Sequence, residues 1–337
     1  MPIYCTLAPS PEHTSPGHPE SLARFAHFKR VLALPLGQPL TWLKAEPATF
    51  DEAARVHTPQ MLHFLQDACQ QAPAIIDDAP TYISKDSWPA ALNAAGGALA
   101  VSRAVLDQPA GRGFALVRPP GHHAEPGRAM GFCLLNNIAI AALDALQRGA
   151  ERAAIVDFDA HHGNGTQSAL LKNEKVGFFS SHQEGIYPQS GRMDDAPQAR
   201  GRLINLPLPA RAGDRAFEQI VAQVLRPWLE RFKPSLMLVS AGFDGHWSDP
   251  LTSLGLSTSG YFRLAQSLLA LADEFCHGRT AFVLEGGYDP QRLADNVAAV
   301  LYAMAGADAA PDPAGPSPYA EPDIGERLAR LRALHCL

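Results

Sequence analysis

Short apolar runs alternate with longer alanine- and leucine-rich segments along most of this chain, and this alternation limits the fold more than any other feature. The runs have the length and composition of strands buried on both faces of a sheet, and they span Phe114–Val117, Ala153–Val156, Val176–Ser180, Leu236–Ser240 and Ala281–Leu284. The longer segments favour helices over Ala90–Leu106, Asn136–Gln147, Phe217–Phe232, Gly260–Phe275 and Pro290–Met304. Such alternation is typical of an α/β fold with a mainly parallel sheet.

The stretch that follows each expected strand is polar or rich in glycine. These stretches are Arg118–His123, Asp157–Gly165, Ser181–Gly191, Ala241–Pro250 and Glu285–Asp289. Ligands of open parallel sheets bind beyond the carboxyl ends of the strands. We therefore expect the five stretches to converge on one site.

Composition narrows the classes of function. The 337 residues are 46% hydrophobic and 18% charged, which allows a large core and argues against a disordered chain. The net charge of −6 implies no domain-wide basic patch, so direct nucleic-acid binding is not expected. Residues 309–322 are rich in proline and alanine, as in a linker. We expect a domain at 1–308 and a tail at 309–337 whose final helix packs on that domain or supports docking or a homo-oligomer.

The cysteines and the N-terminus bear on location. Five cysteines are scattered without a C-x-x-C pair, which fits a reducing compartment and argues against cysteine-ligated zinc. The opening residues MPIYC lack a basic region followed by an apolar stretch, and no apolar run approaches the ~20 residues that span a bilayer. We expect a cytoplasmic protein with no membrane partner.

One histidine and two carboxylates form a candidate metal site. Asp159 and His161 stand as D-x-H directly after an expected strand, which places both side chains on one side of an extended chain. Asp244 follows another strand end and is the third candidate. Three protein ligands and an open position are usual for catalytic zinc. The oxygen-rich set also suits ferrous iron, so the metal stays open.

Two further stretches carry groups suited to catalysis. His122 and His123 lie in a turn with proline and glycine and suit acid–base chemistry near neutral pH. Asp157 is a candidate carboxylate for orienting one imidazole. Tyr288 follows paired glycines and could donate a hydrogen bond to a developing oxyanion.

Two aromatic residues are candidates for the walls of a narrow slot. Phe132 follows Gly131, and Tyr187 lies in another glycine-containing stretch. A slot between them would grip an aliphatic chain and exclude water from an amide. The alternative is that both rings are ordinary core residues.

Taken together, five motifs in order, RPPGHHAEP, MGFC, DFDAHHGNGTQ, SAGFD and LEGGY, resemble the histone deacetylase superfamily within the arginase–deacetylase fold. The similarity runs from about Tyr4 to Met304 and is greatest for the class II branch and its bacterial histone deacetylase-like amidohydrolases. It implies a three-layer α/β/α sandwich around a sheet of about eight strands. Asn164 matches class II, since class I has aspartate at that position.

The resemblance also implies roles for single residues. Zinc would be bound by Asp159, His161 and Asp244. The acid–base groups would be His122, His123 as general base, Tyr288 and Asp157. The acyl-lysine tunnel would be lined by Gly131, Phe132 and Tyr187, with Leu251 at the gatekeeper position. A structural potassium ion would take oxygens from Asp157, Asp159, His161, Ser180 and Ser181. At the rim, Pro80 stands where a polar residue usually contacts the substrate backbone, and Asp77 or Asp78 could substitute for it.

These features predict a zinc-dependent amidohydrolase that removes acetyl or related acyl groups from a lysine-type or other small acylated amine. An acetylpolyamine amidohydrolase is the alternative, against which Leu251 argues, because an acidic gatekeeper would favour a polycation. A ureohydrolase of the arginase type is a second alternative, and it would need a second metal bound by additional aspartates. Asn164 and the lack of a D-x-D motif at Asp244 argue against it. A catalytically silent acyl-lysine binding module is the remaining alternative, against which the filled catalytic positions argue.

Overall fold

The computed structural model describes residues 2–108 and 110–337, and its centre is an eight-stranded sheet. The strand order is β2-β1-β5-β10-β9-β6-β7-β8, and every neighbouring pair is parallel. The strands are β1 (Ile3–Ala8), β2 (Leu40–Trp42), β5 (Arg112–Val117), β6 (Ala153–Asp157), β7 (Val176–Gln183), β8 (Leu203–Leu208), β9 (Leu236–Ala241) and β10 (Thr280–Leu284). The parallel α/β sheet expected from the sequence is confirmed.

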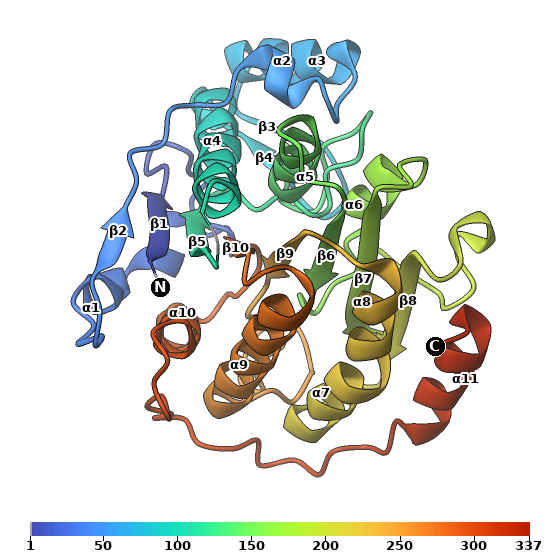
Figure 1. Cartoon of the computed structure of the whole chain (residues 1–337). Helices are drawn as coiled ribbons and strands as arrows, with labels where there is room; N and C mark the ends of the chain where they lie inside the picture. The colour runs from blue at the N-terminus through green and yellow to red at the C-terminus, as the bar shows by residue number, and fades with distance from the viewer. Residues whose placement is uncertain (1, 109) are drawn as a thin grey trace.

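Helices cover both faces of this sheet and give three layers (Figure 1). One face carries α4 (Ser87–Leu106), α5 (Asn137–Gln147) and α6 (Asn164–Leu170). The other carries α7 (Asp214–Ile220), α8 (Arg226–Phe232), α9 (Thr258–Phe275) and α10 (Pro290–Met304). Shorter elements border the layers: α1 (Phe28–Leu32), α2 (Phe50–Ala53), α3 (Pro59–Gln70), the β3–β4 hairpin (Ala74–Ile75, Tyr82–Ile83) and the 3-10 turns η1 (Leu22–Phe25) and η2 (Pro197–Ala199).

Local sequence explains where the main helices begin and bend. Side chains of Asn136, Ser257 and Asp289 accept hydrogen bonds from the first turns of α5, α9 and α10, which satisfies backbone donors that lack intrahelical partners. The expected helix at Phe217–Phe232 is divided by a π-helical turn, η3 (Val221–Leu225). Pro227 follows this turn and has no backbone N–H, so a regular α-helical ladder cannot continue through it.

The tail ends in α11 (Gly325–His335), which lies beside β8 (Figure 1). Its buried residues include Leu328 and Leu331, which join the main core cluster. Residues 309–324 contain no helix or strand. The tail is therefore packed on its own chain, while the domain boundary at 308 stays a prediction.

Across the described residues, none of the helices combines the length and the apolar character that crossing a bilayer requires. All five cysteines carry free thiols, and Cys336 alone among them is exposed.

Candidate metal and acid–base site

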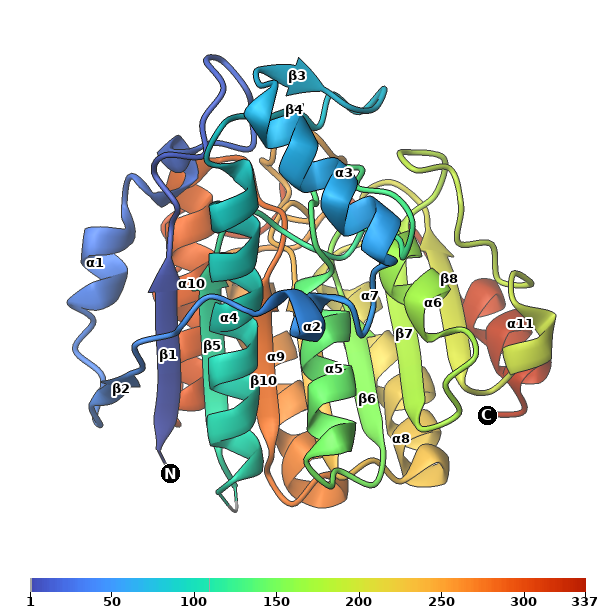
Figure 2. The same cartoon turned by 90° about the horizontal axis from the view of Figure 1, so that it is seen from above.

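The strands all run in one direction, so their carboxyl ends share one edge of the sheet, where the long loops gather (Figure 2). β5 leads into the two adjacent histidines, β6 into the D-x-H motif, β9 into Asp244 and β10 into the loop of Tyr288. β6, β9 and β10 are neighbours in the sheet, with β5 next to β10. The order of the strands thus brings together residues more than 150 positions apart.

Asp159, His161 and Asp244 form a compact group whose possible ligand atoms all lie within 4.8 Å of one another. His161 Nδ1 is 2.9 Å from Asp244 Oδ2 and 3.1 Å from Asp159 Oδ1. Two glycines make this close packing feasible. A Cβ on Gly242 would lie 1.9 Å from Asp159 Oδ2, and one on Gly286 would lie 2.4 Å from Asp244 Oδ2.

Backbone amides orient the two carboxylates of this group. Asp244 Oδ1 accepts a hydrogen bond from Ala160 N at 2.9 Å, and Asp159 Oδ2 accepts one from Gly286 N at 2.9 Å. Burial alone would lower the pKa of His161, but the charges and hydrogen bonds of both aspartates raise it to about 10. The carboxylates therefore stabilise a positive charge between them. The donor set fits a divalent cation, whose binding would displace the proton from Nδ1.

The two adjacent histidines have opposite electrostatic surroundings. His122 Nδ1 donates to Asp157 Oδ2 at 3.0 Å, and although burial lowers its pKa, the charges of Asp159 and Asp157 raise it to about 10. His123 Nδ1 bonds to Asn164 Oδ1 at 2.8 Å. Burial lowers the pKa of His123 well below its usual value, and the charges of His122 and His161 add to this effect. These surroundings favour the charged form of His122 and the neutral form of His123.

The orientation of Asn164 fixes the tautomer of His123. Asn164 Nδ2 donates to Glu125 Oε1 at 2.9 Å, so Oδ1 is the atom that faces His123. An amide oxygen only accepts hydrogen bonds, which places the proton of neutral His123 on Nδ1. Nε2 then carries the free lone pair that a general base needs.

Glu285 supports the histidine turn, a role that was not predicted from the sequence. Its Oε2 accepts hydrogen bonds from Gly121 N at 2.7 Å and His122 N at 3.1 Å, and Ser240 Oγ donates to Oε1 at 3.2 Å. Burial raises the pKa of Glu285 to about 7. The position of Glu285 directly after a buried strand was the available signal.

Tyr288 is held from two sides. Its backbone N–H donates to Asp249 Oδ2 at 2.8 Å, and the guanidinium of Arg24 lies 5.1 Å from its ring centroid. Arg24 also donates to the carbonyls of Gly287 and Glu285. Burial raises the pKa of Tyr288 well above its usual value, so its hydroxyl stays protonated as a hydrogen-bond donor.

Three of the four expected tunnel residues, Gly131, Phe132 and Tyr187, border the histidines and Tyr288. The ring of Phe132 meets that of Tyr288 edge-on at 5.9 Å, and the ring of Tyr187 meets His123 at 5.1 Å. A Cβ on Gly131 would lie 2.5 Å from the His123 ring. Leu251 is 42% exposed, as expected of a residue at an entrance.

The serines expected to bind potassium lie in β7, directly beside β6. Asp157 and Ser180 are paired residues of the two strands. Ser180 Oγ bonds to His182 Nδ1 at 3.0 Å, and Ser181 Oγ is buried with no hydrogen-bond partner among the described residues. Potassium binding stays a prediction.

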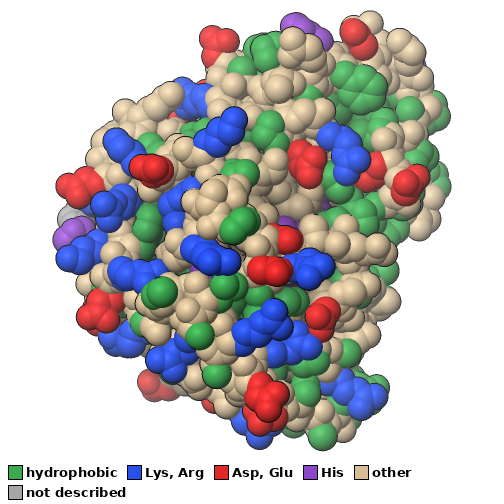
Figure 3. Space-filling view, turned by 90° about the vertical axis from the view of Figure 1, so that its right-hand side faces the viewer, with side chains coloured by type: hydrophobic (Ala, Val, Ile, Leu, Met, Phe, Trp, Pro, Cys, Tyr) green, Lys and Arg blue, Asp and Glu red, His purple; other side chains and the backbone are tan. Residues whose placement is uncertain are grey.

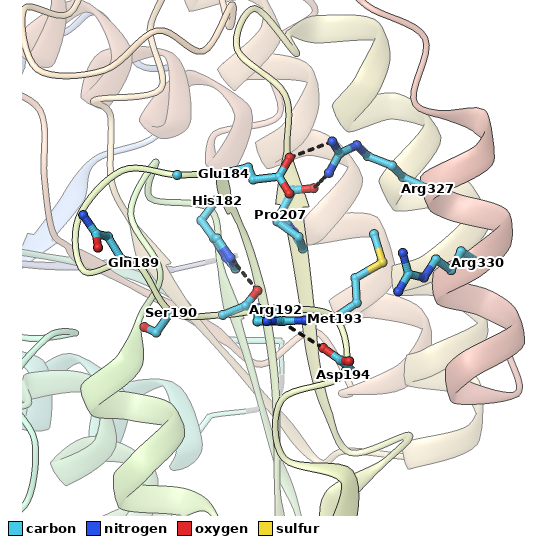
Figure 4. A pocket seen from close by; sticks show the side chains of 12 residues that line it. His182, Glu184, Gln189, Ser190, Arg192, Met193, Asp194, Pro207, Arg327 and Arg330 are labelled. Atoms are coloured by element: carbon cyan, nitrogen blue, oxygen red, sulfur yellow. Dashed lines mark hydrogen bonds and ion pairs between the residues drawn. The ribbon is translucent and has the colours of Figure 1, made fainter.

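A separate pocket of about 560 Å³ shares a wall with the loop that carries Tyr187. In Figure 4, Glu184 at one end of this loop pairs with Arg327 of α11 at 2.7 Å, and Arg192 pairs with Asp194 at 3.4 Å. Lys and Arg side chains are interspersed with Asp and Glu over the molecular face shown in Figure 3, to which α11 belongs. The ion pair with Arg327 ties the loop to the C-terminal helix.

Comparison with known proteins decides the family. Residues 18–304 match the family described as the histone deacetylase domain. The chain belongs to this histone deacetylase family. It is 37% identical to histone deacetylase 14, chloroplastic, of Arabidopsis thaliana, over 96% of this chain and 82% of that protein. It is also 37% identical to the histone deacetylase-like amidohydrolase of Pseudomonas aeruginosa, over 81% of this chain and 73% of that protein.

Solved structures of family members share the fold. The HDA15 HD domain superposes with a TM-score of 0.86 at 29% identity, over 99% of this chain and 94% of that one. The acetylpolyamine aminohydrolase of Burkholderia pseudomallei gives 0.79 at 28% identity, over 90% and 98%. These similarities confirm the arginase–deacetylase fold and a deacetylase-type amidohydrolase family, and one of the solved structures bears the name of the alternative considered from the sequence, an acetylpolyamine aminohydrolase.

Proposed function

We propose that this histone deacetylase family member is a zinc-dependent hydrolase that removes acetyl or related acyl groups from lysine-type amines. One observation carries the proposal: three possible metal ligands, with ligand atoms within 4.8 Å of one another, lie beside two adjacent buried histidines. Asp159, His161 and Asp244 are the proposed zinc ligands. His123, His122, Asp157 and Tyr288 are the proposed acid–base and oxyanion groups.

A bound metal ion would contribute to catalysis in two ways. A zinc ion held by the three side chains would polarise the amide carbonyl and lower the pKa of water from 15.7 to about 7. The proposed potassium ion would have a structural role beside β6 and β7, bound by oxygens of Asp157, Ser180 and Ser181.

The chain's own residues would manage the protons and the developing charge. His123 takes a proton from the attacking water at Nε2, since its other proton on Nδ1 faces Asn164. The Tyr288 hydroxyl donates to the carbonyl oxygen as that atom gains negative charge. His123 then returns its proton to the departing amine, while charged His122, paired with Asp157, adds positive potential nearby.

The substrate choice rests on the entrance and the walls. Phe132 and Tyr187 present aromatic faces suited to a straight aliphatic chain. Leu251, at the gatekeeper position that the resemblance implies, is an exposed apolar side chain, where a polycation would favour a carboxylate. These features favour acyl-lysine over an acetylpolyamine. The cytoplasmic location and a homo-oligomer stay predictions.

Parallel rate measurements test the substrate assignment. Zinc-loaded protein is given acetyl-lysine amides, longer acyl-lysine amides and acetylpolyamines, and amine release is measured. We expect the highest kcat/KM on lysine amides, and Leu251→Glu should shift the preference towards acetylpolyamine. A preference of the unmodified protein for acetylpolyamine would overturn the substrate assignment and leave the metal chemistry standing.

A further inference from the structure

A short rim segment, residues 77–81, is bonded to the turn that forms one tunnel wall. Asp77 Oδ2 accepts a hydrogen bond from Gly131 N at 2.9 Å, and Thr81 Oγ1 accepts one from Phe132 N at 2.8 Å. Asp77 Oδ1 also accepts from Thr81 N at 2.6 Å, which closes the segment on itself. Two side chains of one segment thus hold two successive amides of the wall.

The wall needs such support because its backbone is unusual. Gly131 and Phe132 both have left-handed conformations, with φ of 58° and 66°. A residue with a side chain as large as that of Phe132 rarely adopts this conformation unless its surroundings impose it. Since the turn packs directly on the His123 ring, a change in the turn would move the wall and the proposed base together.

The same segment reaches the second wall and the rim. The Tyr187 hydroxyl is buried. Burial raises its pKa above the usual range, and the charge of the Asp77 carboxylate and a hydrogen bond with it add to the effect. At the rim, His18 Nε2 bonds to Pro80 O at 3.0 Å while its ring meets Phe132 edge-on at 4.7 Å.

We infer that Asp77 is a positioning residue that sets the width of the acyl tunnel by holding the Gly131–Phe132 turn. Each of its oxygens already accepts a hydrogen bond from a backbone amide, so loss of the carboxylate would release the turn that forms the wall. This inference rests on the proposed function and extends it to a determinant of acyl-chain selectivity.

The adjacent residue offers a matched control. Asp78 is exposed and makes no hydrogen bond or ion pair within the described part of the chain, so Asp78→Ala removes the same charge from the same segment. Asp77→Ala removes both acceptors of Asp77, and Asp77→Asn keeps one. The three variants separate wall positioning from rim charge.

The experiment measures kcat and KM for each variant on acetyl- and butyryl-lysine peptides and on an acetylated aminoalkane that has no peptide backbone. We expect Asp77→Ala to lower kcat/KM on acetyl substrates by about 10- to 100-fold, mainly in kcat, because misplacement near the base of about 1 Å has this effect. The acetyl-to-butyryl ratio should change about tenfold. Asp77→Asn should fall between. On the aminoalkane, which has no peptide backbone for Asp78 to contact, Asp78→Ala should match the unmodified protein.

The aminoalkane distinguishes the two roles of Asp77. Equal losses on peptide and aminoalkane substrates support positioning, whereas a loss confined to peptides would show a direct backbone contact and overturn the inference. Hydrogen exchange gives a readout without catalysis: Asp77→Ala should accelerate exchange at the amides of Gly131 and Phe132. Unchanged exchange at these amides would refute the inference, whether or not the protein hydrolyses amides. Absence of hydrolysis with normal acceleration of exchange would refute the proposed function and leave the role of Asp77 in the turn standing.

Discussion

Replacement of Asn164, the neutral hydrogen-bond partner of His123, by a carboxylate tests whether His123 is the general base. Asn164 Oδ1 lies 2.8 Å from His123 Nδ1, and both residues are buried. Asn164→Asp alone would also place the new carboxylate against that of Glu125, and the two would repel each other, because Asn164 donates a hydrogen bond to Glu125. The double variant N164D/E125Q avoids this, since the new amide can donate to the new carboxylate.

The size of the effect follows from the geometry. Charges about 4 Å apart interact by about 4 kcal/mol at an effective dielectric constant of about 20, which equals about 3 pKa units. Burial opposes ionisation of the new carboxylate, so we expect the pKa of His123 to rise by about 1–3 units. The base must be neutral to act, and its pKa in the unmodified chain is well below the usual value. Activity is therefore lost as pH falls through this pKa, and a raised pKa moves the loss to higher pH.

The assay is the pH dependence of kcat/KM on an acetyl-lysine amide, with E125Q alone as the control. We expect the acid limb of N164D/E125Q to move up by about 1–3 pH units relative to E125Q. Coincident acid limbs for the two variants would refute the assignment of His123 as the base.

Three further changes test other parts of the site and its support. Tyr288→Phe should lower kcat by about 10²–10³-fold with little change in KM, because it removes one oxyanion donor; full activity on acetyl-lysine would contradict its role. Gly131→Ala should lower kcat/KM by about 10²-fold, since the added Cβ would lie 2.5 Å from the His123 ring; near-normal rates would show that the wall can shift. Arg118→Met should lower the free energy of unfolding by about 3–5 kcal/mol in urea titrations, because it breaks a fully buried ion pair with Glu20 at 2.7 Å; a loss below about 1 kcal/mol would contradict this.

Five interior strands, β5, β6, β7, β9 and β10, were predicted because they consist largely of apolar residues, the pattern of strands buried on both faces. Three strands of this sheet were missed: β1, which is interior but partly exposed, and β2 and β8, which form the two edges. Pro207 within β8 argues against a central strand, because proline has no N–H to donate to a neighbour. It is tolerated in an edge strand, where the amides on the outer side have no neighbouring strand to bond.

The convergence of the candidate metal and acid–base residues was predictable because parallel topology places strand ends together. The supporting contacts were not, since they depend on how loops close in three dimensions. Glu285 holds Gly121 across 164 residues, and Asp77 holds Gly131 across 54. No local pattern specifies these pairs.

The central claim is that a metal held by Asp159, His161 and Asp244 is needed for amide hydrolysis. The most direct test is to remove metal with a chelator, measure residual hydrolysis of an acetyl-lysine amide, and titrate zinc back while following bound metal by mass spectrometry. We expect loss of activity on metal removal, its return in proportion to bound zinc, and neither zinc binding nor recovery in Asp244→Asn. Full hydrolysis by the metal-free protein would contradict the claim.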